Sequence, residues 1–156
     1  MRLNTFIRQV VKEKQNEEAL HYADTNFRTI VEATEDSIYM IDRHFRYLFI
    51  NTPHQKRLGI FGENYESHLY KDLHSKEETD RFVHSINQVI THNNYYSEEY
   101  EKEGRYYNRK FIPVRYQTSS QTLAVTVVSI DITDRVRLED EVARGASLVT
   151  ATFEST

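Results

Sequence analysis

The stretch 122–135, TLAVTVVSIDITDR, decides the fold because it passes from strand chemistry to helix chemistry within a few residues. The side chains of residues 123–128 alternate between two sets that are both largely apolar, which predicts a central strand covered on both faces. The apolar run ends after Ile132, and Thr133 is a residue type that caps helices at their N-terminus. Asp134 then falls in the first turn, where the helix dipole favours an anion. A helix is therefore predicted to leave the sheet here.

The composition indicates one folded domain with flanking helices. Of 156 residues, 38% are hydrophobic and 28% charged, which suffices for one core and is too short for two full domains. A net charge of -4 without a block of like charge gives no reason to expect nucleic-acid binding. No apolar run approaches the roughly 18 to 20 residues that span a bilayer, so we expect a cytoplasmic segment without membrane contact.

An apolar stripe at helical spacing predicts a helix over residues 3–23. The stripe begins with Leu3, Phe6, Ile7, Val10 and Val11. Asp24 and Thr25 are predicted to break or cap this helix before a second, shorter one. Two interpretations of the stripe stay open: it packs against its own sheet, or it packs against a second copy of the chain.

A hairpin and a short helix are predicted next. Residues 36–51, DSIYMIDRHFRYLFIN, contain two short runs rich in Ile, Tyr and Phe, separated by a polar turn. Thr52 is predicted as the cap of the following helix, with Pro53 at its first position and Gly59 at its end. Residues 61–74 indicate only loop and short helical turns.

A capping box and a tight turn organise the second half. Ser75 and Glu78 fit the S-x-x-E pattern, and the apolar stripe behind them predicts a helix over 77–91. Residues 95–116 predict a hairpin around Glu103-Gly104. Its register pairs Tyr96 with Phe111, Glu98 with Arg109 and Tyr100 with Tyr107.

Three stretches together resemble a PAS domain, the sensor module of many bacterial and archaeal signalling proteins. They are FRTIVEAT at 27–34 with strands that end at Asp42 and Asn51, the order of the later elements, and the Asp-Ile-Thr-Asp-Arg sequence at 131–135 before a charged helix. Pattern alone predicts an α+β fold with an antiparallel sheet. The resemblance implies a PAS-like, five-stranded antiparallel sheet with helices packed on one face, flanked by N-terminal and C-terminal signalling helices.

The same reasoning divides the chain into a connector helix at 1–23, a PAS sensor domain at 24–133, and an exit helix with the start of a following module at 134–156. A shift of 122 residues (154 minus 32) aligns Glu32-Ala33-Thr34 with Glu154-Ser155-Thr156. Such a period matches one sensor domain plus its linker, which predicts a longer chain of tandem sensor domains.

The sequence gives no reason to expect catalysis by this segment. It has no P-loop, no dinucleotide-binding glycine motif, no nucleophile elbow and no zinc-protease motif. None of the seven histidines is followed by an acidic residue, as a phosphate-accepting histidine of a sensor kinase usually is. The resemblance implies that catalysis belongs to an output domain of the parent protein, such as a histidine kinase; a diguanylate cyclase or phosphodiesterase is the alternative.

No cofactor is identified. His84 stands where related haem sensors carry a ligand, but its helical position is nearly opposite the apolar stripe, so it should face solvent. The pair His68 and His74 has no nearby cysteine and is a weak metal signal. Zero cysteines exclude disulfides, thiolate metal sites and the cysteine-linked flavin of the light-oxygen-voltage subgroup. Haem and cysteine-linked flavin are therefore not expected, and no metal site is predicted.

The Glu98–Arg109 pair is the most informative chemistry. If its face of the hairpin lines a pocket, the forked donors of Arg109 can hold a small anionic ligand. The alternative is an exposed ion pair at the sheet edge, worth about 0 to 1 kcal/mol. The predicted ligand-binding residues are Arg109, Glu98, Tyr96, Tyr107 and Phe111.

Two functions of different classes follow. The first is a sensory module that binds a small ligand or partner and relays the change through its flanking helices, with Asp131, Thr133 and Arg135 as relay residues. The second is a ligand-free dimerisation module with a filled core. Either function is compatible with a homodimer formed through the N-terminal helix.

Overall fold

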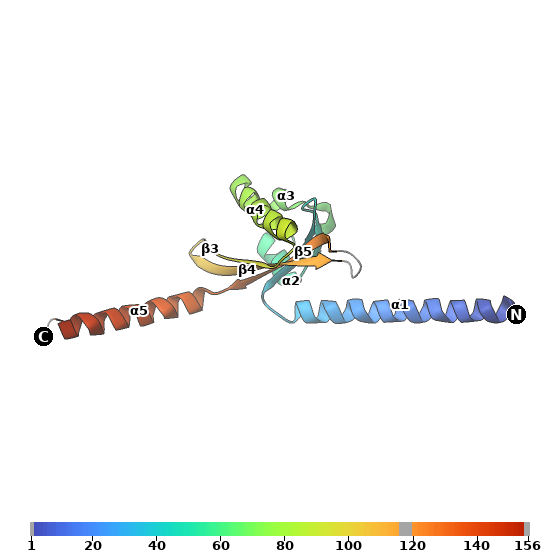
Figure 1. Cartoon of the computed structure of the whole chain (residues 1–156), viewed down its shortest axis with the longest axis horizontal. Helices are drawn as coiled ribbons and strands as arrows, with labels where there is room; N and C mark the ends of the chain where they lie inside the picture. Colours follow the sequence, from blue (N-terminus) through green and yellow to red (C-terminus); the bar gives the residue numbers. More distant parts are fainter. Residues whose placement is uncertain (1, 116–119, 155–156) are drawn as a thin grey trace.

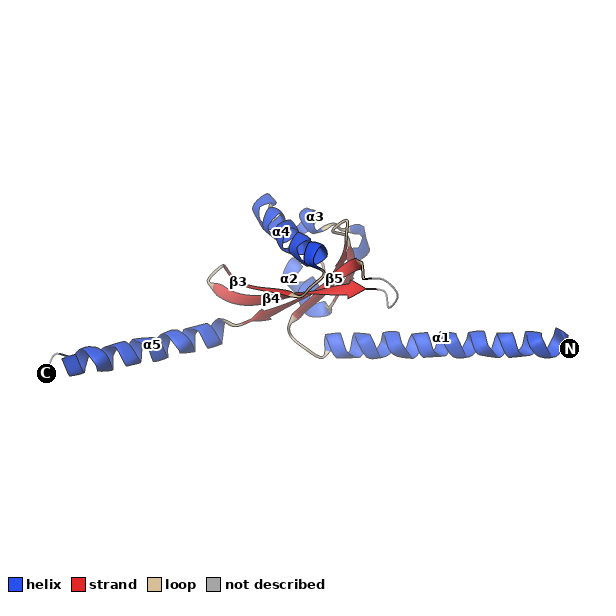
Figure 2. Cartoon of the chain, viewed as in Figure 1, coloured by secondary structure: helices blue, strands red, loops and turns tan. Residues whose placement is uncertain are grey.

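The predicted central strand, β5, lies in the middle of a five-stranded sheet in which all neighbours are antiparallel. In the computed structural model, which describes residues 2–115 and 120–154, the sheet has the order β2-β1-β5-β4-β3. The strands in that order are β2 (Tyr47–Ile50), β1 (Ser37–Asp42), β5 (Thr122–Asp131), β4 (Arg105–Arg115) and β3 (Tyr96–Lys102). Figure 2 shows the curved sheet in red. The predicted five-stranded antiparallel sheet is confirmed.

The two faces of the sheet are covered unequally. Val125, Val127 and Ser129 of β5 are buried on the inner face, on which the helices pack. On the outer face Ala124 is buried, whereas Thr126 and Val128 are only half-buried. The prediction that β5 is covered on both faces therefore holds fully for the inner face and in part for the outer one.

Several short helical segments and one longer helix, all between β2 and β3 in the chain, pack on the inner face of the sheet and form the core with it (Figure 1). They are α2 (Thr52–Leu58), the 3-10 turn η1 (Tyr65–Ser67), α3 (Tyr70–Leu73) and α4 (Lys76–His92). The capping box of α4 is confirmed: Ser75 Oγ accepts a hydrogen bond from Glu78 N at 3.2 Å, and Glu78 Oε2 accepts one from Ser75 N at 3.0 Å. Phe82 and Ile86 of α4 are fully buried against the sheet.

The N-terminal helix is longer than predicted. α1 (Arg2–Glu32) runs without interruption, so the predicted break at Asp24 and Thr25 is wrong. Asp24 accepts a bond from Arg28 Nε at 3.1 Å, and Thr29 Oγ1 donates to the Thr25 carbonyl at 2.8 Å. These bonds one turn apart stabilise a continuing helix, and the segment contains no Gly or Pro to end it.

The C-terminal helix is one continuous element. α5 (Thr133–Glu154) runs through the predicted exit helix and into the residues predicted to begin a following module. Figure 1 shows α1 and α5 leaving the domain on opposite sides, with the chain ends far apart. Ser155 and Thr156, part of the predicted following module, lie outside the described residues, as does Tyr116 of the predicted hairpin.

A buried asparagine, rather than Thr52, caps α2. Asn51 Oδ1 accepts bonds from His54 N at 3.2 Å and Ile38 N at 3.0 Å. Its Nδ2 donates to the carbonyls of Val31 at 3.0 Å and Asp36 at 2.8 Å. This side chain, fully buried, joins the end of α1, the start of β1 and the first turn of α2. Gly59, with φ of 74°, ends α2 in the left-handed conformation, as predicted.

We expect Asn51→Ala to lower the free energy of unfolding by about 3 kcal/mol, because it leaves four buried or part-buried backbone groups without their partner. Urea unfolding followed by circular dichroism measures the change. Asn87→Ala, at an exposed position of α4, is the matched control and should stay within about 0.5 kcal/mol of wild type. An equally small effect at Asn51 would show that this side chain does not hold the three elements together.

Candidate functional site

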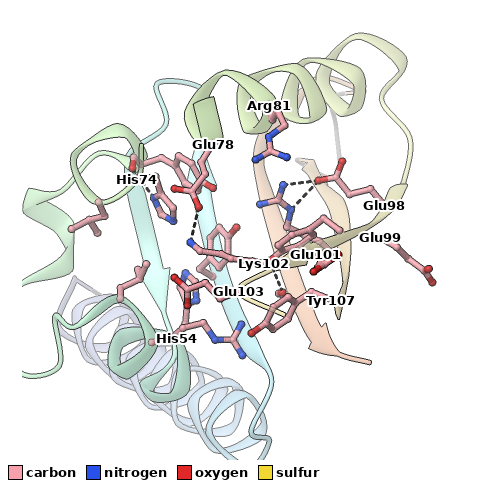
Figure 3. A pocket seen from close by; sticks show the side chains of 18 residues that line it. His54, His74, Glu78, Arg81, Glu98, Glu99, Glu101, Lys102, Glu103 and Tyr107 are labelled. Carbon is pink, nitrogen blue, oxygen red and sulfur yellow. Dashed lines mark hydrogen bonds and ion pairs between the residues drawn. The ribbon is translucent and has the colours of Figure 1, made fainter. Parts of the chain in front are cut away.

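A cavity of about 510 Å³ lies between the inner face of the sheet and the short helices. This volume is within the range of small-molecule sites. The tyrosines that line it are Tyr39, Tyr70, Tyr100 and Tyr107. The charged residues that line it are Arg57, Arg81, Lys102, Arg109, Glu78, Glu98, Glu99, Glu101 and Glu103. Figure 3 shows Glu78 of α4 and Lys102 of β3 meeting across this space, while Glu99 points away from it. Its walls therefore offer aromatic surface together with charges of both signs.

The tight turn at Glu103-Gly104 sets the pairing of β3 with β4, the strands that carry Glu98 and Arg109 of the cavity wall. Glu103 and Gly104 have φ values of 53° and 77°, the left-handed conformation that a two-residue hairpin turn requires. The predicted pairs Glu98 with Arg109, Tyr96 with Phe111 and Tyr100 with Tyr107 are all observed. Since side chains alternate along a strand, this register turns Glu98 and Arg109 toward the helices.

The Glu98–Arg109 pair lies inside the cavity, not exposed at the sheet edge. Nε and Nη2 of Arg109 donate to Glu98 Oε1 at 3.0 and 2.6 Å, and Ser85 Oγ of α4 donates to Glu98 Oε2 at 3.1 Å. The side chain of Arg109 is only 12% exposed, and that of Glu98 only 23%. The pair joins the edge strand β3 to β4, as the alternative of a cross-strand pair at the sheet edge states, but it is not exposed there.

Aromatic rings surround the guanidinium of Arg109. Its central carbon lies 4.7 Å from the ring centre of Tyr100, 5.2 Å from that of Phe111 and 5.4 Å from that of Phe82. Burial alone would lower the pKa of Arg109, but the neighbouring Tyr39, Tyr70 and Glu98 raise it above its ordinary value. The cation is thus permanent, and Glu98 occupies the edge of its fork formed by Nε and Nη2.

Two of the five predicted ligand-binding residues do not line the cavity. Phe111 is fully buried in the core, and Tyr96 packs against its ring with the centres 5.7 Å apart. Their aromatic side chains fill space between the sheet and α4, which removes them from the wall. Glu98, Tyr107 and Arg109 do line the cavity.

Sequence reasoning missed His54. Its ring stacks on Tyr39 with the centres 4.4 Å apart and an interplanar angle of 9°, and the residue is only 6% exposed. Neither ring nitrogen has a hydrogen-bond partner among the described residues. Burial, followed by the charge of Arg57, lowers the pKa of His54 to about 3, so the imidazole is neutral near neutral pH. The only sequence signal was its position four residues before Leu58, on the same side of a short predicted helix.

The other histidines form no metal site in the part of the chain that the structure describes, where no group of three or more suitable side chains is found. His74 lines the cavity and stacks on Tyr70 with centres 3.8 Å apart. His68 contacts Glu63 at 3.3 Å. His84 is exposed on α4, as predicted.

The predicted relay residues meet where β5 passes into α5. Asp131 Oδ1 accepts bonds from Thr133 N at 3.0 Å and Thr133 Oγ1 at 2.6 Å, and Asp131 Oδ2 contacts Arg105 Nη2 at 2.7 Å. Partial burial opposes the effect, but these bonds from Thr133 and Arg105 lower the pKa of Asp131 to about 2. Arg135 Nη2 reaches Glu99 of β3 at 2.8 Å.

Thr133 does not act as the predicted N-cap. It is the first residue of α5, and its Oγ1 accepts a hydrogen bond from Tyr106 N at 2.9 Å. The carboxylate of Asp131, two residues before Thr133, instead accepts a hydrogen bond from the first backbone amide of α5. The buried Thr133 hydroxyl therefore ties α5 to the start of β4.

At the other end, the carboxylate of Glu32 ties α1 to α2. Its Oε1 and Oε2 accept hydrogen bonds from Thr52 N at 3.1 and 2.9 Å. Since α2 carries His54, Arg57 and Leu58 of the cavity wall, one short helix connects the cavity to the end of α1.

The comparison with known families agrees with this architecture. The sequence profile of the PAS fold matches residues 31–137. The chain belongs to the PAS family. No helix among the described residues is long and apolar enough to cross a membrane.

Solved PAS structures share the fold at low sequence identity, while no curated protein matches the chain in a sequence search. A domain of an HTR-like protein from Haloarcula marismortui is 19% identical with a TM-score of 0.53, over 64% of this chain and 100% of its own. A sensory box sensor histidine kinase from Vibrio cholerae is 14% identical with a TM-score of 0.57, over 76% of this chain and 98% of its own. The PAS domain of the histidine kinase ThkA is 21% identical with a TM-score of 0.51, over 62% of this chain and 99% of its own.

The buried imidazole predicts a pH dependence of stability. Between its ordinary pKa of 6.5 and the lowered value of about 3, the unfolded chain binds a proton at His54 that the folded chain does not. The free energy of unfolding should therefore fall as pH decreases below 6.5, by at most about 1.4 kcal/mol per pH unit from this residue. Burial lowers the pKa of His74 as well, which adds a loss in the same direction.

Urea unfolding at about pH 7 and about pH 5 measures this slope. In His54→Phe, which keeps a ring to stack on Tyr39, the slope should become markedly shallower. Parallel pH profiles of wild type and variant would contradict the assignment.

Proposed function

We propose that this PAS domain is a sensory module that binds a small anionic molecule in its cavity and relays the change through α1 and α5. The observation that carries this proposal is the placement of the cavity. Its walls include β3, β4, β5 and α2, the elements that hold the two flanking helices. A shift of one of these four elements would therefore act on a helix that leads out of the domain.

Membership of the PAS family and the similarity to domains of sensor histidine kinases support a role in signal transduction. The output domain proposed for the parent protein is a histidine kinase. The segment itself is a sensory domain and not an enzyme. We therefore expect residues 1–156 alone to show no autophosphorylation from ATP.

A second candidate function is dimerisation without a ligand, and one observation favours it. The apolar stripe of α1 is exposed along the part of the helix that projects from the domain (Figure 1). Its members and their exposed fractions are Leu3 at 70%, Phe6 at 64%, Ile7 at 50%, Val10 at 45% and Val11 at 48%. A parallel homodimer through α1 would bury these side chains.

Native mass spectrometry of the purified segment separates the two functions. The sensory function predicts a dimer held by α1 whose mass exceeds that of two bare chains. The excess is the mass of a bound small molecule, and gentle activation should remove it. A dimer that carries no added mass under any condition would instead support the dimerisation function alone.

Arg109→Ala should weaken binding of the retained anion at least about tenfold. The substitution leaves the Glu98 carboxylate unpaired in the cavity wall, where it repels an anion. Glu98→Gln should strengthen binding, because it leaves the cation without its partner. Isothermal titration measures both, with Arg43→Ala in the exposed β1–β2 turn as control. Equal affinities for all variants would mean that the pair serves packing only.

In the parent protein, Asp131→Ala should change the response of the output domain and leave the sensor core folded. The variant removes the bonds to Thr133 and Arg105 that orient α5, while Asp131 itself contributes nothing to the apolar core. An autokinase assay with added ligand reports the response, and circular dichroism reports the fold. A folded variant with a wild-type response would exclude Asp131 from the relay.

A further inference from the structure

Two neighbouring side chains of α2 have bonding capacity that no described residue uses. His54 and Arg57 are three positions apart, which places them one turn apart on the same side of a helix, and both line the cavity. The start of α2 is fixed by the caps from Asn51 and Glu32. These two groups are therefore held in a defined relation to each other and to the cavity.

His54 lies at the inner end of this pair. Its ring nitrogens are buried and have no hydrogen-bond partner among the residues that the structure describes. A neutral imidazole has one donor and one acceptor. Leaving both unpaired away from water costs free energy, and a ligand hydroxyl, which can donate or accept, removes the part of that cost that belongs to the nitrogen it bonds.

Arg57 lies at the outer end and is the cavity cation without an ion pair to the described carboxylates. Arg109 is paired with Glu98 at 2.6 Å, Lys102 with Glu78 at 2.6 Å, and Arg81 with Glu77 at 3.9 Å. The guanidinium of Arg57 instead lies 5.1 Å from the ring centre of Tyr107. Arg57 is itself exposed, so water and salt screen part of its charge, but an anionic group in the cavity still meets there a cation that no described carboxylate pairs.

The acidic residues of the rim limit this attraction without removing it. Glu99 is neutralised by Arg135 at 2.8 Å, and Glu78 by Lys102. Glu101 and Glu103 make no ion pair to the described cations, but both are exposed, where water and salt screen them. Binding of an anion should therefore strengthen when Glu103 is replaced by glutamine.

The space between the two groups is bounded by tyrosine rings from the sheet and from α3. Tyr39, Tyr70 and Tyr100 line this space. His54 covers one face of Tyr39, and His74 and Phe82 stack on the two faces of Tyr70, so these two rings meet a ligand through their edges and hydroxyl groups. Aromatic walls favour a flat ring, which they contact in stacked or edge-on arrangements. A ligand that fits all three features carries a ring, a carboxylate and a hydroxyl.

We propose that the cavity binds a small aromatic hydroxycarboxylate, with its hydroxyl hydrogen-bonded to His54 and its carboxylate paired with Arg57. This assignment rests on the proposed sensory function and gives its ligand a chemical class. It also gives α2 the role of the ligand-contacting element, through which an occupied cavity acts on Glu32 and α1.

Isothermal titration of residues 1–156 with four probes tests the proposal. The probes are para-hydroxybenzoate, benzoate without the hydroxyl, para-hydroxybenzyl alcohol without the charge, and lactate without the ring. We expect para-hydroxybenzoate to bind most tightly, and each of the others at least about tenfold more weakly.

The variants assign each group of the ligand to one residue. Arg57→Gln should weaken para-hydroxybenzoate and benzoate at least about tenfold and leave the alcohol unchanged. His54→Phe, which keeps the ring on Tyr39, should weaken para-hydroxybenzoate and the alcohol by a similar factor and leave benzoate unchanged. Arg43→Gln, in the exposed turn between β1 and β2, should change none of these affinities.

Three results would overturn the assignment: no binding of any probe to wild type, affinities that neither variant changes, or lactate binding as tightly as para-hydroxybenzoate. Native mass spectrometry separates this failure from that of the sensory function. If wild type retains another small molecule and none of the probes binds, the ligand class is wrong and the sensory function stands. If it retains no small molecule and binds no probe, both are wrong.

Discussion

One buried amide holds together the parts of this domain that sequence separates. Asn51 makes four hydrogen bonds, at 2.8 to 3.2 Å, to backbone groups of α1, the segment before β1, β1 itself and α2. Each of these backbone groups would cost about 1 to 3 kcal/mol if buried without a partner. The angle at which α1 leaves, the entry into β1 and the start of α2 are thus fixed by the same side chain. The position of the cavity wall on α2 follows from that constraint.

A second constraint sets the character of the cavity. A guanidinium removed from water needs both a counter-charge and a favourable contact surface, and Arg109 has Glu98 and three aromatic rings. Glu98 therefore already neutralises Arg109, the cation that the sequence pattern marks most clearly. Among the described residues, the groups of the cavity wall that remain able to bind a ligand are the ring nitrogens of His54 and the guanidinium of Arg57, both on α2.

The parts of the fold that follow from local chemistry were predictable from the sequence. The turn at Glu103-Gly104 fixes the register that brings Glu98 opposite Arg109, and the capping box at Ser75 fixes the start of α4. His54 was not predictable, because its burial depends on how α2 packs against Tyr39, far away in the chain. The break predicted in α1 failed for a related reason: Asp24 can cap a helix or pair with Arg28, and the continuing helix uses it for pairing. Tyr96 and Phe111 follow the predicted alternation, yet the packing of α4 decides that they fill the core.

The attachments of α5 differ in strength, and this difference decides how it can move. Its first residue is held by the buried hydroxyl of Thr133, which bonds to Tyr106 N. Beyond that point its direction depends on ion pairs of Asp131 with Arg105 and of Arg135 with Glu99, whose cationic side chains are more than half exposed. Exposed pairs contribute about 0 to 1 kcal/mol each, whereas a buried bond that is lost leaves an unpaired group at greater cost. Under the proposed sensory function, Thr133 would act as a pivot, about which a small displacement of the ends of β3 and β4 would turn α5 at low cost. Because Glu99, Arg109 and Tyr107 belong to those strands and also line the cavity, we expect a displacement that accommodates a ligand to change the weakly held direction of α5 before it disturbs the buried bond of Thr133.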